Sequence, residues 1–214
     1  MNSTAAVARR AIATPALALV ALSALVVAAP SRAAAEAVVG SPAPAFSLTD
    51  IDGKPHALAD YAGKVVVLEW VNYECPFVRK HYDSGNMQQL QKSAASEGVV
   101  WLSINSSAPG KQGNYPPETW KKLVADKGAA PAAVLLDPDG KVGKAYGAKT
   151  TPHMFVVDGR GTVVYAGAID DTPSTNVADV KTAKNLVTAA VAETRSGKPV
   201  TVASAPPYGC SVKY

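Results

Sequence analysis

The stretch VVVLEWVNYECPFVRKH, residues 65–81, decides how the rest of the chain is interpreted. Its first part, Val65–Trp70, is too apolar for a half-exposed strand and too β-branched for a good helix, which favours a central strand covered on both faces. Pro76 suits the first position of a helix, where its missing N–H costs nothing, so Cys75 is the expected N-cap residue. The stretch therefore predicts a buried strand that delivers a thiol to the start of a helix.

A cysteine in this position is placed to be reactive. The free N–H groups and the positive end of the helix dipole both favour the thiolate over the thiol. Arg79, one helical turn on, and Lys80 add positive charge nearby. The alternative is an inert buried cysteine, but the order of strand, cysteine, proline and basic helix favours the reactive thiol.

The first 35 residues have the layout of a secretory signal peptide. Arg9 and Arg10 precede an almost wholly apolar run, 16–29, and small residues follow at 33–35, so cleavage is expected to leave a mature N-terminus between Ala34 and Glu36. The alternative is an uncleaved membrane anchor, but the apolar run falls short of the ~20 residues that span a bilayer. We therefore expect an exported protein, periplasmic or secreted, whose residues 36–214 form one domain with no stable membrane association after cleavage.

Removal of that segment changes the charge and cysteine arguments. Residues 1–35 hold three arginines and no acidic residue, so the remaining 18 basic residues face 17 acidic ones and the net charge falls from +4 to +1. The remaining chain therefore has no basic excess of the kind that indicates a nucleic-acid partner, and we expect none. Cys75 and Cys210 are the only cysteines, and in an oxidising compartment such thiols pair.

Hydrophobic periodicity and turn residues predict an α/β order of elements. The expected elements are a hairpin over 46–58, strands at 65–70, 99–104 and 133–136, a hairpin of 154–157 with 162–167, a helix after Cys75 that restarts near 83–85, helices over 116–128 and 175–195, and a tail without regular structure. Parallel strands at 65–70 and 99–104 would bring Cys75 and the polar loop 105–115 to the same carboxyl edge, where open α/β sheets bind ligands. The loop is then either a wall of the active site or an ordinary surface loop.

The cysteine-proline at a strand-to-helix turn, with Thr151-Pro152 before a later strand, resembles the thioredoxin fold. The segments SPAPAFSLTD (41–50), DGK (52–54) and GKVVVL (63–68) are similar to the opening of its redoxin, or peroxiredoxin-like, branch, the alkyl hydroperoxide reductase and thiol-specific antioxidant type. The resemblance covers about residues 40–195. It implies a mixed central sheet flanked by helices, a redox-active Cys75, and a cis bond before Pro152 that places the Thr151 backbone beside this cysteine.

The departures from these families are informative. Thioredoxin-type proteins have C-x-x-C, but Val78 stands at the second position here, so no local thiol resolves a mixed disulfide. The peroxiredoxin threonine three residues before the cysteine and proline seven before are replaced by Asn72 and Leu68. The second nearby cysteine of Sco-type copper carriers is missing, and we expect neither a metal nor a cofactor. Among the histidines, His56 and His81 are expected on the solvated surface, and His153 is expected to tune the thiol.

We therefore expect an exported thiol oxidoreductase with Cys75 as the attacking thiolate, Cys210 as the resolving partner, and Thr151, Pro152 and Arg79 around them. Its substrate is a peroxide or a protein disulfide, and a thiol reductant regenerates it. One alternative is a disulfide reductase or isomerase that acts on exported proteins. The other is a non-catalytic binding module in which Cys75 and Cys210 form a permanent disulfide.

Overall fold

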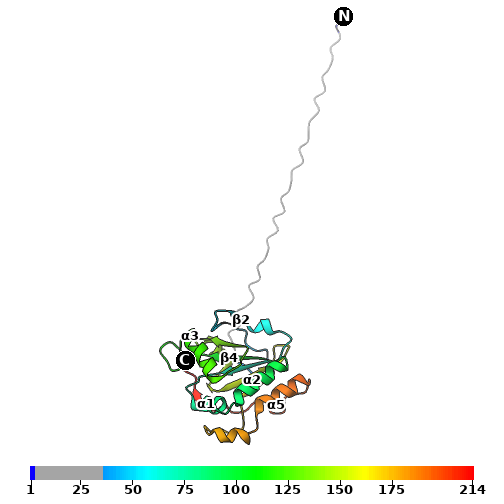
Figure 1. The fold of residues 1–214 in the computed structure, drawn as a ribbon. Helices are drawn as coiled ribbons and strands as arrows, with labels where there is room; N and C mark the ends of the chain where they lie inside the picture. Colours follow the sequence, from blue (N-terminus) through cyan, green and yellow to red (C-terminus); the bar gives the residue numbers. More distant parts are fainter. Residues whose placement is uncertain (3–35) are drawn as a thin grey trace. The chain divides into compact units, whose positions relative to one another are not determined.

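A computed structural model describes residues 1–2 and 36–214 (Figure 1). The predicted signal peptide and its cleavage site between Ala34 and Glu36 fall on residues outside these ranges. Within the described ranges, no helix combines the length and the apolar character needed to cross a bilayer.

Strands and helices alternate along the chain in the order expected. The strands are β1 (Ser47–Asp50), β2 (Pro55–Ala57), β3 (Val66–Trp70), β4 (Val100–Asn105), β5 (Ala133–Leu136), β6 (Thr150–Thr151), β7 (His153–Val157), β8 (Val163–Gly167) and β9 (Cys210–Ser211). The helices are α1 (Pro76–Asp83), α2 (Asn86–Ser96), α3 (Pro117–Lys127), α4 (Lys141–Tyr146) and α5 (Leu186–Arg195), with two 3₁₀ turns, η1 (Leu58–Tyr61) and η2 (Val177–Lys181).

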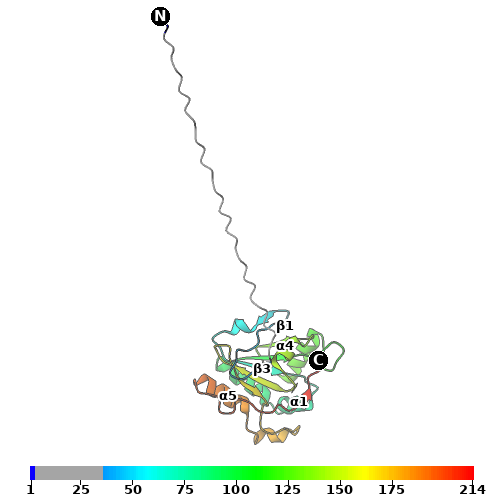
Figure 2. The same cartoon turned by 180° about the vertical axis from the view of Figure 1, so that it is seen from behind.

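The main sheet has seven strands in the order β2-β1-β5-β4-β3-β7-β8. β3 runs parallel to β4 and antiparallel to β7, and every one of its five residues is buried. This mixed central sheet flanked by helices is the thioredoxin-like α/β fold predicted from the sequence (Figures 1 and 2). The predicted hairpins, β1 with β2 and β7 with β8, are also confirmed.

Alternate residues of β3 supply two hydrophobic layers, one on each face of the sheet. Val67 belongs to a layer that includes buried residues of α1, α2, α3 and α5, whereas Val66, Leu68 and Trp70 belong to the layer beneath α4. Side chains point alternately to the two faces of a strand, so a strand in the middle of such a sheet has to be apolar throughout. This accounts for the continuous apolar run that predicted β3.

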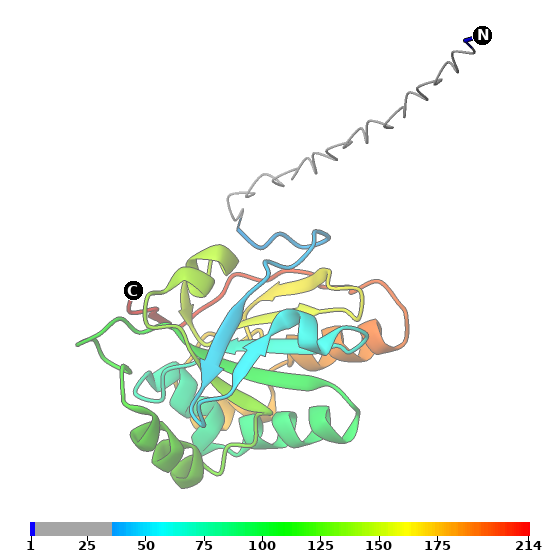
Figure 3. The same ribbon diagram turned by 90° about the horizontal axis from the view of Figure 1, so that it is seen from above.

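The parallel pairing of β3 with β4 sets one edge of the sheet as the place where two loops emerge. Trp70 lies opposite Ile104 at the ends of these strands, so Cys75 and loop 105–115 follow from the same edge, as predicted. The C-terminal segment, red in Figures 1 and 3, runs to this edge and lies beside α1.

Two sequence-based expectations were wrong. The helix predicted over 175–195 is divided into η2 and α5, because Asn176 and Asn185 each accept a hydrogen bond from a backbone N–H two or three residues on and so begin separate helices. The tail predicted to lack regular structure forms β9, which pairs antiparallel with β6.

Candidate active site

Cys75 sits where the sequence predicted, as the N-cap residue of α1 with Pro76 at the first helical position. Its side chain is fully buried, with 0% of its surface exposed. The Sγ atom lies 3.0 Å from the Thr151 carbonyl oxygen, to which the thiol donates a hydrogen bond. A substrate cannot reach a sulfur atom in this state, so something that covers Cys75 has to move first.

The Thr151–Pro152 peptide bond is cis, which confirms the sequence prediction. It places the Thr151 carbonyl beside the Cys75 sulfur. The Thr151 hydroxyl is buried and makes no hydrogen bond among the described residues. Thr151 therefore presents both an acceptor and an unused donor close to the thiol.

Cys210 in the tail covers Cys75. β9 pairs with β6 so that Cys210 lies opposite Thr151 and Ser211 opposite Thr150. The Cys210 N–H lies 3.4 Å from the Cys75 Sγ atom and donates to it. Both cysteines are free thiols in this structure, and the disulfide between them stays a prediction. The two thiols that the sequence singled out, 135 positions apart, are thus neighbours.

The surroundings divide the two thiols into a nucleophile and a protonated partner. Burial raises the pKa of Cys75, but hydrogen bonds from the Cys210 side chain and N–H and from the Val78 N–H outweigh it and leave the pKa lowered. Although Sγ makes no full capping hydrogen bond, the Val78 N–H in the first turn favours the thiolate. Burial, together with the hydrogen bond to Cys75 and its charge, raises the pKa of Cys210 to about 11.

These pKa shifts predict two separate ionisations in the reduced protein. We expect Cys75 to ionise below the ~8.5 of an ordinary thiol and Cys210 only in strongly alkaline solution, as measured by thiolate absorbance against pH. In a Cys210→Ala variant the single remaining step should move to higher pH, because the thiol that donates to the Cys75 thiolate is gone. A first step at or above ~8.5, or one unmoved by the substitution, would contradict this assignment.

Arg79 and the histidines lie differently from what the sequence suggested. The Arg79 side chain is 58% exposed and its Nε atom is 3.7 Å from Asp83, so its effect on the Cys75 thiolate stays a prediction. His153 is on the strand face of Phe155, against which its ring packs, whereas Cys75 belongs to the layer on the other face. The expected solvated position of His81 was wrong, because its side chain is completely buried.

Loop 105–115 contacts both the active-site turn and the tail. The Asn72 side chain accepts a hydrogen bond from the Glu74 N–H at 3.1 Å and donates to the Gln112 carbonyl at 3.4 Å. The Ala108 N–H donates to the Lys213 carbonyl at 2.7 Å. These contacts favour the interpretation of the loop as a wall of the site. Asn72, which stands at the peroxiredoxin threonine position, is used to hold this loop.

One buried acid near the site escaped the sequence analysis. Glu69, the fourth residue of β3, is completely buried, and burial raises its pKa even though four side chains donate to it. The donors are Trp101 at 2.8 Å, Ser103 at 2.9 Å, Tyr82 at 3.0 Å and Gln91 at 3.4 Å. A lone carboxylate in an apolar strand was the available signal. Its satisfied network joins α1 and α2 to the sheet.

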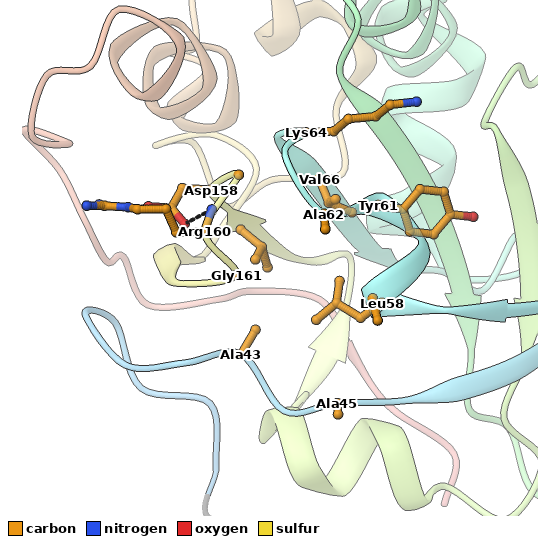
Figure 4. Close-up of a pocket in the computed structure, with 13 residues that line it drawn as sticks. Ala43, Ala45, Leu58, Tyr61, Ala62, Lys64, Val66, Asp158, Arg160 and Gly161 are labelled. Carbon is orange, nitrogen blue, oxygen red and sulfur yellow. Dashed lines mark hydrogen bonds and ion pairs between the residues drawn. The ribbon is translucent and has the colours of Figure 1, made fainter.

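A pocket of about 270 Å³ lies elsewhere (Figure 4). It is lined by Val66 and Val157, which pair at the start of β3, and by Leu58 and the turn at Arg160. Cys75 follows the opposite end of β3, so this pocket does not open onto the thiols. Within the described ranges there is also no group of three or more His, Cys, Asp or Glu side chains arranged to hold a metal ion.

Comparisons with known proteins concern the family and the fold of this chain. The model of the AhpC/TSA family matches residues 39–166, more than half of the chain. The thiol-disulfide oxidoreductase ResA of Geobacillus thermodenitrificans is 29% identical over 125 residues, which are 58% of this chain and 66% of ResA, just under two thirds of its length. An uncharacterized conserved protein from Geobacillus kaustophilus superposes with a TM-score of 0.70 at 29% identity, over 83% of this chain and 92% of that one. A protein from Chlorobium tepidum, provisionally named thiol:disulfide interchange protein DsbE, gives a TM-score of 0.50 at 27% identity, over 61% and 85%.

Proposed function

Because this chain belongs to the AhpC/TSA family, we propose that it is a thiol-disulfide oxidoreductase that reduces disulfides through Cys75, with Cys210 as the resolving thiol. The observation that carries the proposal is the placement of a thiol of lowered pKa against one of raised pKa, on an edge where backbone can pair with Thr151. An attacking thiol needs thiolate character, whereas its partner has to stay protonated until it is used.

The proposed reaction has two exchange steps. The Cys75 thiolate attacks one sulfur of the substrate disulfide, forms a mixed disulfide and expels the other substrate sulfur as a thiolate, which takes up a proton. Cys210 then loses its proton and attacks the Cys75 sulfur, which forms the Cys75–Cys210 disulfide and releases the second substrate thiol. The substrate gains two electrons, and an external dithiol restores the pair.

Disulfides fit this site better than peroxides. The curated relatives that match are named thiol-disulfide oxidoreductases, and the two peroxiredoxin positions before the cysteine hold Leu68 and Asn72. The pairing of Cys210 with Thr151 also has the form that an extended polypeptide substrate would take at the same edge. The tail occupies that edge when docked, so such a substrate would have to displace it.

The test is to mix the reduced protein with oxidised glutathione and, separately, with hydrogen peroxide, and to follow the products by intact mass. We expect glutathione exchange to yield the internal disulfide quickly, and a Cys210→Ser variant to accumulate a glutathione adduct on Cys75. Faster oxidation of Cys75 by peroxide than by the disulfide would assign a peroxidase instead. An absence of reaction with either oxidant would favour a binding module.

We also propose that the protein is exported, on the grounds of the sequence layout of residues 1–35. Oxidising compartments outside the cytosol are where a two-cysteine protein of this kind meets disulfide substrates. N-terminal sequencing of the exported protein should begin between Ala34 and Glu36, and a protein that began at Met1 would contradict this.

A further inference from the structure

We propose that Tyr208 is a positioning residue for Cys210. Its hydroxyl group binds the tail to a buried charged cluster between α1 and the segment after β8, and so sets how closely Cys210 is held against Cys75. The inference rests on the proposed function, in which Cys210 resolves the mixed disulfide. The anchor cluster consists of Lys80, His81 and Asp170.

The anchor cluster is a buried group of charged and polar side chains beside the active site. The Lys80 Nζ atom donates to Asp170 at 3.2 Å and to the Thr172 carbonyl at 2.8 Å. The side chains of Lys80 and Asp170 are 0% and 3% exposed. The desolvation free energy of two buried charges often exceeds the energy of their attraction, so a contribution to stability does not by itself explain why this ion pair is buried.

Tyr208 completes this cluster from the tail. Its hydroxyl donates to the second Asp170 carboxylate oxygen, and its ring lies 5.6 Å from the Lys80 ammonium group and 5.8 Å from the Phe77 ring. Phe77, Lys80 and His81 occur at i, i+3 and i+4 and so share one face of α1. The tail therefore contacts α1 within the first two turns after its N-cap residue Cys75.

The His81 ring is oriented so that its Nε2 atom faces the Tyr208 hydroxyl group. Its Nδ1 atom accepts from the Asn86 amide at 3.0 Å, so the ring proton lies on Nε2, 3.4 Å from the Tyr208 oxygen. Burial lowers the pKa of His81 to about 4 and leaves the ring neutral; the charge of Asp170 opposes this shift, and the charge of Lys80 adds to it. The Tyr208 oxygen can therefore donate to Asp170 while it accepts from His81.

The anchor acts on Cys210 through a single residue. Gly209 lies between them with a φ of 141°, and a Cβ atom on it would stand 2.1 Å from the Thr151 carbonyl oxygen. The backbone of the tail therefore lies directly against Thr151 at this residue, with no room for a side chain. β9 has only two residues, and so short a ladder does not hold a strand by itself. Contacts on both sides of β9 therefore have to fix Cys210 against Cys75. After it, the Val212 N–H donates to the Lys149 carbonyl at 3.1 Å and the Lys213 carbonyl accepts from the Ala108 N–H, and before it the contact is Tyr208.

A Tyr208→Phe variant tests this role. The internal disulfide holds the tail docked and loses this hydrogen bond in full, whereas the reduced tail can undock. The glutathione equilibrium that converts the reduced pair to the Cys75–Cys210 disulfide should therefore fall roughly tenfold to a hundredfold, the range of a hydrogen bond to a charged group. Resolution of a Cys75-glutathione adduct should slow in proportion. The variant should fold, because Asp170 retains Lys80 and the Thr172 N–H.

Tyr146→Phe is the matched control. It removes the Tyr146 hydroxyl group, which donates to the Pro44 carbonyl at 2.8 Å. The Tyr146 side chain is 1% exposed and lies on the other face of the sheet. It should lower the free energy of unfolding and leave the glutathione equilibrium unchanged. An unchanged equilibrium in Tyr208→Phe, or an equal fall in both variants, would overturn the proposal. If the unmodified protein forms no internal disulfide at all, the proposed function itself fails.

Discussion

Replacement of Cys75 by serine is expected to lower kcat/KM for reduction of a disulfide substrate by on the order of 10³-fold or more, because the other thiol, Cys210, has a pKa raised to about 11 and stays protonated near neutral pH. The serine hydroxyl does not ionise near neutral pH, although it can still donate to the Thr151 carbonyl as the thiol does at 3.0 Å. The fold should therefore persist. Initial rates of insulin reduction with dithiothreitol as the electron donor measure the loss.

Cys210→Ser is the control for this substitution. It leaves the Cys75 nucleophile in place, so the first exchange step should continue while the mixed disulfide accumulates. The account would be wrong if Cys75→Ser retained a tenth of the activity, or if Cys210→Ser turned over as fast as the unmodified protein.

The second large effect is expected at Gly209. A Gly209→Ala substitution places a Cβ atom 2.1 Å from the Thr151 oxygen and 2.7 Å from its carbon, at a φ that side chains rarely adopt. The tail has to withdraw from Thr151. We expect Cys75 to become more accessible and to react faster with oxidised glutathione, whereas resolution by Cys210 slows by about tenfold or more. Stopped-flow mixing followed by acid quench and mass analysis separates the two steps.

Gly197→Ala is the matched control for that substitution. Gly197 also has a positive φ, 68°, but a Cβ atom there meets nothing within 4 Å. An alanine there has a backbone cost of its own but meets no collision. Opposite changes in the two exchange steps should therefore occur at Gly209 alone. Equal changes in both steps in both variants would show that backbone strain, and not tail docking, controls the thiols.

The sequence predicted the parts of this site that depend on local chemistry. The apolar β3 run, Pro76 at the start of α1 and the Thr151–Pro152 pair each carry their structural meaning within a few residues. Their positions in the sheet followed from the strand–helix–strand order. The contact between Cys75 and the tail was expected from the cysteine count, and the structure brings the two residues together.

The parts that escaped prediction depend on segments far apart in the sequence. In the sequence, His81 is expected at the surface because its helix is polar overall, but in the structure Asp170 and Tyr208, from distant segments, lie against its ring. In the sequence, a glycine beside Cys210 suits a mobile tail, whereas in the structure the close approach to Thr151 requires a glycine there. The usable signals were the spacing of Phe77, Lys80 and His81 and the tyrosine two positions before Cys210.

The central claim is that Cys75 and Cys210 form a redox couple and not a permanent disulfide, and the reduction potential of the pair tests it most directly. Equilibration with glutathione redox buffers, read by intact mass, gives this potential. The account predicts a value between about −120 and −270 mV, as in catalytic pairs of this fold, with turnover that depends on Cys210. A potential below about −300 mV, with turnover unaffected by Cys210→Ser, would contradict it and assign the pair to structural stabilisation.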